Sequence, residues 1–340
     1  MTNIPFYSNS IPIVFSADEN YIPYMSVTIQ SIMENSDQNK NYVFYVLHKG
    51  ITDKTLDIFI KQIALFTQFS IEFIDVTPYI SRYKFFISNH ITVEAYFRLL
   101  IPELLTEYSK VIYLDCDMII CTDIAELFNI NIESYLLAAV RDIPLVIRLY
   151  NNKEMSKDMK NSCHILLNLK EPSKYFNSGL CVFNIELFRK TISSEKLLEI
   201  AASQNWNFHD QDVLNYIGEG KVLLLPFHWN LMTTPDTEYL PDYLRHEYID
   251  AEKNPKIIHY KPWISNKYIL HFELFWKYAT HTPFIDIIIE RMKAKDFFSF
   301  YNESFDQNII LNIKHRKGIS LKFILIDCVK AWLFRDKLKK

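Results

Sequence analysis

The sequence predicts an α/β protein built on a largely parallel, doubly wound sheet with helices on both faces. Strand-like and helix-like segments alternate over the first 76 residues, and that order implies parallel pairing with right-handed connections. The strand-like runs are also continuously apolar, as expected for strands that are covered on both faces. At 340 residues, the chain is long enough for one large domain, or one domain with an appendage.

Apolar periodicity indicates each element of this first part. The first predicted helix, for example, places Ile22, Met25, Ile29 and Ile32 on one side. We expect strands at 11–15, 42–47 and 70–76, with helices at 21–34 and 52–66. Ligands of such sheets bind beyond the carboxyl ends of the strands. The segments that follow strands are therefore the places to look for a site.

The composition excludes two common phosphate-binding devices. The chain has only five glycines and contains neither G-x-G-x-x-G nor G-x-x-x-x-G-K-[ST]. If it handles phosphates, side chains and a metal must hold them. The five cysteines have no zinc-type spacing and indicate a reducing compartment. Since no signal peptide or membrane-spanning apolar run is recognisable, we expect a cytoplasmic protein.

Two aspartates at the end of a buried strand form the most informative motif. The apolar run 111–114 is followed by Asp115 and Asp117, and then by Met118 and two isoleucines. Unpaired carboxylates in such a passage are costly and repel each other. A divalent cation that prefers oxygen ligands, Mn²⁺ or Mg²⁺, would satisfy both. A turn or a helix cap is the structural alternative.

Polar groups also follow the first strand. Asp18 and Asn20 could hydrogen-bond the imide edge of a uracil while Tyr21 stacks on the ring. Capping of the next helix by Asp18 explains the same residues equally well.

Two further segments have a functional and a structural interpretation of similar weight. Asn177, Ser178 and Gly179 precede an apolar run, which indicates either close approach to a ligand or a bulge entering a strand. The segment 209–212 (His-Asp-Gln-Asp) opens a helix-like stretch, where its acidic residues either line a sugar pocket or complement the helix dipole.

His259 follows the strand-like run 256–258, which we expect to belong to the same sheet and to end at its ligand-binding edge. It could be the third metal ligand, although a lone histidine is more often structural. Lys261 could neutralise a diphosphate. The polar stretch 142–174 is weakly periodic, and we expect it to be a lid, an acceptor-binding excursion or a plain surface insertion.

Charge is unevenly distributed along the chain. Residues 314–340 contain nine basic and two acidic residues, a balance of +7, whereas the whole chain carries −3 and the rest therefore −10. The basic tail also contains aromatic residues, so we expect it to bind the anionic inner face of the plasma membrane. A helix docked on the body is the alternative. The acidic body argues against nucleic acid as a partner.

Six motifs, in order, resemble those of glycosyltransferase family 8, which comprises retaining bacterial lipooligosaccharide galactosyl- and glucosyltransferases and also glycogenin. They extend from about residue 11 to Trp263, and residues 275–284 resemble the segment after the family's last motif. The motifs are FSADENY (15–21), YFRL (96–99), YLDCD (113–117), FNSG (176–179), DQD (210–212), and IIHY (257–260) with KPW (261–263).

The resemblance implies a GT-A fold, that is, a single nucleotide-binding, Rossmann-like mixed-sheet domain at 10–284, with a helical C-terminal region at 285–340. It also implies a UDP-hexose donor and Mn²⁺, with Mg²⁺ as the other candidate. Asp115, Asp117 and His259 would coordinate the metal together with the diphosphate.

For the donor, the resemblance assigns the uridine to Asp18, Asn20 and Tyr21, and places Ser16, Cys116 and Ser178 in the same site. Arg98, Asn177, Asp210 and Gln211 would surround the sugar. Gln211 matches the residue nearest the reacting face, and Arg98 and Asp210 would complete the catalytic group.

One departure from the family concerns Lys261. Family members usually have a Gly-containing insert between the His-Tyr pair and Lys-Pro-Trp, whereas here Lys261 directly follows Tyr260. The backbone donor of that glycine is missing, so Lys261 is expected to reach the diphosphate only if the chain is locally rerouted.

We therefore expect a metal-dependent retaining enzyme that moves galactose or glucose from a UDP-sugar to a saccharide or glycolipid acceptor of a bacterial surface glycan, such as lipopolysaccharide or capsule. Two alternatives stay open. A sugar-phosphate nucleotidyltransferase also uses paired aspartates, but that class usually has a Gly-rich N-terminal loop. A glycan-binding protein with a decayed site is the non-enzymatic alternative.

Overall fold

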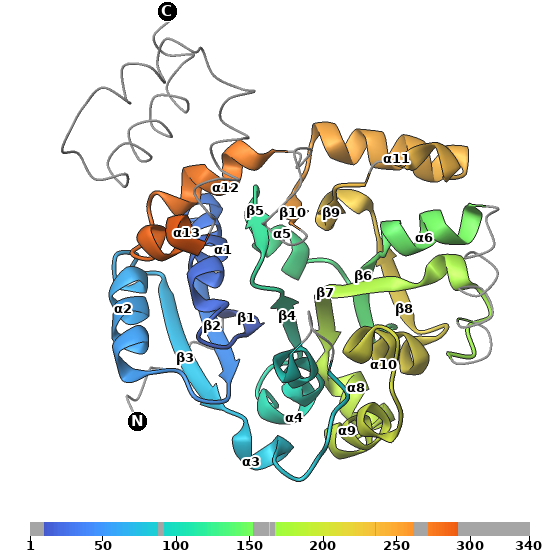
Figure 1. The fold of residues 1–340 in the computed structure, drawn as a ribbon, viewed down its shortest axis with the longest axis horizontal. Helices are drawn as coiled ribbons and strands as arrows, with labels where there is room; N and C mark the ends of the chain where they lie inside the picture. Colours follow the sequence, from blue (N-terminus) through green and yellow to red (C-terminus); the bar gives the residue numbers. More distant parts are fainter. Residues whose placement is uncertain are drawn as a thin grey trace, which may run out of the picture.

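The computed structural model describes residues 10–87, 92–151, 163, 167–234, 236–260 and 271–291 (Figure 1). Its strands are β1 (Ser10–Ser16), β2 (Asn41–His48), β3 (Phe69–Asp75), β4 (Lys110–Leu114), β5 (Met118–Ile120), β6 (Leu137–Arg141), β7 (Phe176–Asn184), β8 (Val222–Leu225), β9 (Leu231–Met232) and β10 (Ile257–His259).

Its α-helices are α1 (Ile22–Asn35), α2 (Asp53–Ile63), α3 (Thr77–Ile80), α4 (Ile101–Leu104), α5 (Ala125–Phe128), α6 (Ile143–Tyr150), α8 (Ile185–Thr191), α9 (Ser194–Ser203), α10 (His209–Gly218), α11 (Asp242–Lys253), α12 (Phe272–Ala279) and α13 (Ile285–Arg291). Its 3-10 helices are η1 (Val93–Leu100), η3 (Pro172–Lys174), η4 (Phe227–Trp229) and η5 (Thr237–Tyr239).

The main sheet has seven strands in the order β3-β2-β1-β4-β7-β6-β8. Strands β3, β2, β1 and β4 are parallel, as the alternation of strands and helices predicts. Strand β7 runs antiparallel to both β4 and β6, and β8 is parallel to β6. The predicted mixed α/β sheet is confirmed, and the carboxyl ends of β1, β4 and β6 share one edge with the amino end of β7.

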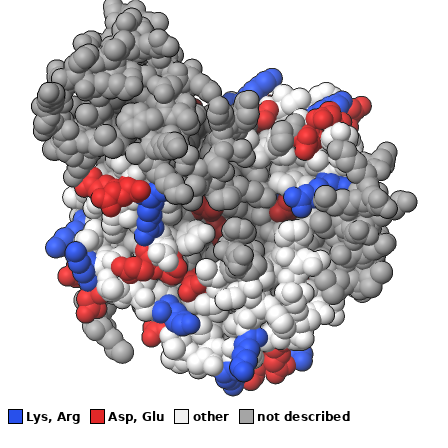
Figure 2. Space-filling model, viewed as in Figure 1, with Lys and Arg blue, Asp and Glu red and all other residues white. Residues whose placement is uncertain are grey.

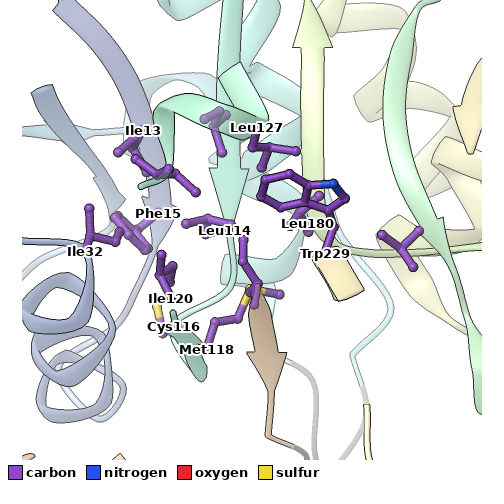
Figure 3. Close-up of a cluster of buried hydrophobic side chains, with 14 of the residues drawn as sticks. Ile13, Phe15, Ile32, Leu114, Cys116, Met118, Ile120, Leu127, Leu180 and Trp229 are labelled. Carbon is purple, nitrogen blue, oxygen red and sulfur yellow. The ribbon is translucent and has the colours of Figure 1, made fainter. Parts of the chain in front are cut away.

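Both faces of this sheet are buried, which explains why its strands are continuously apolar. Along β1, Ile13 and Phe15 point into one core and Val14 into the other, because successive side chains of a strand alternate between faces. Figure 3 shows the first of these cores, where Phe15, Leu114 and Leu180 of neighbouring strands lie close to side chains of α1 and β5. The rigid central strands fix the positions of the residues that follow them.

A second, three-stranded sheet has the order β5-β10-β9. Our prediction placed the strand before His259 among the strands of the main sheet, and that placement is wrong. β10 instead pairs antiparallel with β5, so that His259 lies opposite Met118. Helix α1 is buried along nearly its whole length because it contacts β5 as well as α12 and α13. The pairing brings His259 back to the strand that follows Asp117.

The start of the segment 142–174 is a buried helix, whereas we expected the segment to be a lid, an acceptor-binding excursion or a surface insertion. Ile143–Tyr150 forms helix α6, whose first turn is capped by the Asp142 carboxylate, which accepts a hydrogen bond from the N–H of Leu145. Its apolar side chains enter both main cores. Of the remainder, 152–162 and 164–166 lie outside the described residues.

Lys261 and the basic tail at 314–340 also lie outside the described residues. In the part that is described, none of the helices has the length and apolar character needed to cross a membrane. On the face in Figure 2, the Lys and Arg side chains of the described surface are intermixed with Asp and Glu side chains.

Candidate active site

A cleft of about 310 Å³ opens where the carboxyl ends of β1, β4 and β6 meet the amino end of β7. This is the position at which ligands bind in open α/β sheets. Helices η1, α6 and α10 complete its walls. The residues that line it are Ser16, Ala17, Asp18, Tyr21, Thr92, Glu94, Ala95, Arg98, Tyr113, Asp115, Cys116, Asp117, Asp142, Pro144, Leu145, Arg148, Asn177, Ser178, Phe208, Asp210 and Gln211.

Asp115, Asp117 and His259 form a compact cluster beside this cleft. One ligand atom from each residue lies within 4.8 Å of the other two. The His259 Nε2 atom is 3.2 Å from Asp117 Oδ1 and 3.9 Å from Asp115 Oδ2. Two carboxylates and one imidazole are a donor set that suits Mn²⁺ or Mg²⁺.

Two neighbours of the cluster support a metal-binding role. The other ring nitrogen of His259, Nδ1, is 3.0 Å from the side-chain oxygen of Asn230, and this is the kind of contact that orients metal-binding histidines. Gly179 leaves space for the cluster, because a Cβ there would lie 2.6 Å from His259 Cε1 and 2.7 Å from Asp115 Oδ2. The residues present therefore fit a divalent cation.

Arg98 connects the cluster of Asp115, Asp117 and His259, here called the metal-type cluster, with Asp210 on the opposite wall of the cleft. It is fully buried on η1, and its guanidinium lies 2.9 Å from Asp115 Oδ1 and 3.1 Å from Asp210 Oδ2. It also donates to the carbonyl and hydroxyl oxygens of Ser178 and lies over the ring of Tyr113. Burial opposes its charge, but the carboxylates of Asp115 and Asp210 outweigh that effect and raise the pKa of Arg98 above its ordinary value.

Asp210 and Gln211 begin helix α10 and are both buried. Burial raises the pKa of Asp210 to about 6, although the Arg98 charge opposes this shift. Gln211 Oε1 accepts hydrogen bonds from the N–H of Ser178 and from the Asn177 amide, both at 3.0 Å. Its amide nitrogen donates to Asp142 and Tyr175. This wall is a rigid array of donors and acceptors, of the kind that sugar hydroxyl groups require.

The Asn177–Gly179 segment forms the bulge that was its structural interpretation, and two of its residues line the cleft. It lies inside β7, and the register of β7 with β6 shifts between Ala139 and Val140, so the strand bulges here. The same bulge turns Asn177 and Ser178 into the cleft. A bulge beside a site commonly re-aims side chains in this way.

The turn after β1 carries the residues predicted for the nucleotide. Asp18 Oδ1 accepts hydrogen bonds from the N–H groups of Asn20 (2.9 Å) and Tyr21 (2.8 Å), so it shapes the turn before α1. Asp18, Tyr21 and Ser16 line the cleft, whereas Asn20 is not among its lining residues and donates to Asp18. Cys116 is buried and donates to the Ser16 carbonyl, a structural contact.

Asp142 and Asn230 are among the polar residues of the site that sequence reasoning missed. Asp142 lines the cleft from the N-cap position of α6. In the sequence, it looks like any aspartate that caps a helix, so its role in the site could not be recognised. Asn230 is buried between His259 and Asn177. It follows an apolar stretch outside any motif, and nothing in the sequence brings it near His259.

Comparison with known proteins gives a consistent result. A model of glycosyl transferase family 8 matches residues 12–267. General stress protein A of Bacillus subtilis (strain 168) is 32% identical over 288 residues, which cover 79% of this chain and 93% of that protein. The lipopolysaccharide 1,2-glucosyltransferase of Escherichia coli (strain K12) is 27% identical over 271 residues, 75% of this chain and 73% of that enzyme.

Solved structures agree with the fold. The ligand-free WbbM bifunctional glycosyltransferase matches with a TM-score of 0.76 and 26% identity, over 86% of this chain and 53% of that one. The galactosyltransferase LgtC, solved with donor and acceptor sugar analogues, matches with a TM-score of 0.64 and 19% identity, over 80% of this chain and 96% of that one. These likenesses confirm the predicted GT-A fold.

Proposed function

This chain belongs to glycosyltransferase family 8, and we propose that it moves a hexose, galactose or glucose, from a UDP-sugar to a saccharide or glycolipid acceptor of a bacterial surface glycan. One observation carries the proposal. A single cleft joins a carboxylate–imidazole cluster (Asp115, Asp117, His259), suited to a metal–diphosphate, to an amide-rich wall around Gln211, suited to a sugar. Similarity to a lipopolysaccharide glucosyltransferase supports the acceptor class.

Asp115, Asp117 and His259 would hold Mn²⁺, or Mg²⁺, at the diphosphate end of the cleft. When bound, such an ion neutralises the negative charge that builds on the departing UDP. Asp18 and Tyr21 would receive the uridine, with Ser16 beside them on the cleft wall. Lys261 would add a cation to the diphosphate if the chain is locally rerouted, although it lies outside the described residues.

At the sugar end, the acceptor hydroxyl would attack the anomeric carbon from the face that UDP leaves. The bond to the UDP oxygen breaks as the new glycosidic bond forms, and the hydroxyl proton passes to the leaving phosphate oxygen. The geometry of Gln211 supports this front-face course. Its carbonyl oxygen already accepts two hydrogen bonds, from Ser178 and Asn177, and both would have to break before it could act as a nucleophile. Gln211 therefore orients the sugar.

We also propose that the protein is cytoplasmic and binds the inner face of the plasma membrane through its basic tail. The charge contrast between the tail and the body supports this assignment.

The test is a screen of UDP-hexoses for hydrolysis and transfer by the purified protein, with Mn²⁺ or with exhaustive chelation. Asp117→Ala should abolish turnover and leave the fold intact, because it removes one ligand and relieves a carboxylate pair. Turnover of the wild type that survives chelation would contradict the metal assignment. Absence of turnover with every UDP-hexose would favour a glycan-binding protein with a decayed site.

A further inference from the structure

A buried chain of hydrogen bonds connects His259 with the sugar-binding wall through one residue, Asn230. This amide is 1% exposed and directly precedes β9. Its nitrogen is 3.0 Å from Asn177 Oδ1, and its oxygen is 3.0 Å from His259 Nδ1. Asn177 in turn contacts Gln211 and Asp142.

The polarity of the chain is fixed by a backbone group. The N–H of Gly179 lies 3.0 Å from the Asn177 side chain, and a backbone N–H can only donate. Asn177 must therefore present its oxygen there. Asn230, which contacts the same oxygen, must present its NH₂ group.

The orientation of Asn230 then decides which nitrogen of His259 carries a proton. With its NH₂ group committed to Asn177, Asn230 presents its oxygen to His259, so Nδ1 must be the donor. Nε2 is the nitrogen that faces Asp117. A neutral imidazole with the proton on Nδ1 has its free lone pair on Nε2, the form that binds a metal through that atom.

A second backbone donor fixes the orientation of the Gln211 amide in the same way. The N–H of Ser178 donates to Gln211 Oε1, so Gln211 presents its NH₂ group to Asp142 and Tyr175. Asn177 donates to that same Gln211 oxygen. Two adjacent backbone N–H groups of the β7 bulge thus orient every amide between His259 and Gln211.

We propose that Asn230 is a positioning residue with two functions. Through its oxygen it keeps a proton on Nδ1 of His259 and aims Nε2 at the metal position. Through its NH₂ group it ties that histidine to Asn177, and thereby to the sugar-binding wall. The roles toward the metal and the sugar rest on the proposed function, whereas the protonation state of His259 does not.

The first experiment reads the His259 ring directly. Protein labelled with [¹⁵N]histidine gives the protonation of each ring nitrogen, and His259→Gln assigns the signals. In the wild type, we expect Nδ1 to be protonated both without metal and with Mg²⁺. In Asn230→Leu, we expect the proton to be no longer confined to Nδ1. An unprotonated Nδ1 in the wild type would overturn the proposal.

The second experiment separates the two functions of Asn230. Mn²⁺ binding is followed by electron paramagnetic resonance of the free ion. Asn230→Leu removes both hydrogen bonds and should weaken Mn²⁺ binding about 10- to 100-fold. Asn230→Asp can still accept from Nδ1 but places a second oxygen against Asn177. It should therefore keep near wild-type Mn²⁺ affinity while kcat falls.

Asn215→Leu is the matched control. Asn215 is a buried amide of the same size that bonds the backbone of Phe176 and Gln211 and contacts no metal-type ligand. It should lose stability but keep Mn²⁺ affinity. Equal Mn²⁺ affinity in Asn230→Leu and the wild type, or equal weakening in Asn230→Leu and Asn230→Asp, would overturn the proposal. If the wild type binds no Mn²⁺, the metal assignment fails, and the ring experiment alone decides the role of Asn230.

Discussion

Buried Arg98 and partly buried Asp115 form an ion pair in which Nη2 lies 2.9 Å from Oδ1, and this leaves Oδ2 of the same carboxylate facing His259. The two oxygens of Asp115 are therefore divided between an internal cation and the metal-type cluster. Tyr113 donates to Oδ1 as well, so the carboxylate cannot easily rotate. Because Arg98 also holds Asp210, one guanidinium fixes groups on both sides of the cleft.

Replacing Arg98 tests this arrangement. Arg98→Met leaves the buried Asp210 carboxylate and the partly buried Asp115 carboxylate without their cation, and should lower the free energy of unfolding by about 3–5 kcal/mol, measured by urea titration. Arg98→Lys keeps the charge but cannot reach Asp115, Asp210 and Ser178 together, so its loss should be smaller. Arg82→Met is the control, because the Arg82–Glu195 pair is exposed to solvent and its loss should have little effect. Similar losses in the two Met variants would contradict this reasoning.

Gly179→Ala should impair metal binding. The added Cβ would come within 3 Å of His259, Asp115 and Asn177, so these side chains must shift. We expect Mn²⁺ affinity to fall by about tenfold or more, together with about 1–3 kcal/mol of stability. Gly218→Ala creates an equally close contact, 2.8 Å from a Val222 methyl group, but away from the cluster. If both variants bind Mn²⁺ like the wild type, the tight packing around the cluster has no functional role.

Gln211→Ala should reduce turnover about 100-fold or more and leave the affinity for UDP nearly unchanged, because Gln211 lies on the wall assigned to the sugar. Calorimetric titration of UDP with Mn²⁺ and steady-state kinetics would measure the two effects separately. Gln62→Ala is the control, since Gln62 is also a buried amide, but its side chain bonds Ser26 and Gln30, and none of these three residues lines the cleft. A parallel loss of UDP affinity in Gln211→Ala would place this residue elsewhere.

The sequence predicted the elements that local patterns determine. β2 was expected at 42–47 and is observed at Asn41–His48, because its apolar run and the flanking polar residues mark both ends. Asp115 was located by the contrast between a carboxylate pair and the apolar strand before it. These signals lie within a few residues and need no knowledge of the fold.

Long-range pairing could not be predicted. β10 has three residues, which is too few for a pattern to reveal that its partner is β5 and not a strand of the main sheet. Asn230 meets His259 only because β9 and β10 are neighbours. Helix α6 escaped notice because it has only eight residues, too few for its apolar period to stand out beside the polar stretch that follows.

Deletion of residues 314–340 tests the membrane assignment. The truncated protein should keep its activity on a soluble acceptor and lose its binding to vesicles that contain anionic lipid. High salt should weaken the binding of the full chain in part, because it screens the attraction. Sedimentation with vesicles measures both effects. Unfolding of the truncated protein would instead indicate that the tail is a helix docked on the body.

Asp210 should make stability depend on pH in a direction opposite to most carboxylates. Burial raises its pKa from 3.8 to about 6, so the folded state binds the proton more tightly than the unfolded chain does. Its favourable contribution is complete below pH 3.8 and is lost as the pH rises to about 6. Relative to the wild type, Asp210→Asn should therefore gain up to about 3 kcal/mol between these limits, measured by urea titration at each pH. Asp75 provides a control of opposite sign, because hydrogen bonds from Thr77 lower its pKa. Asp75→Asn should lose stability relative to the wild type as the pH rises toward 3.8, with no further change between 3.8 and about 6. If the difference between Asp210→Asn and the wild type does not change across this range, then Arg98 compensates the buried charge of Asp210 completely.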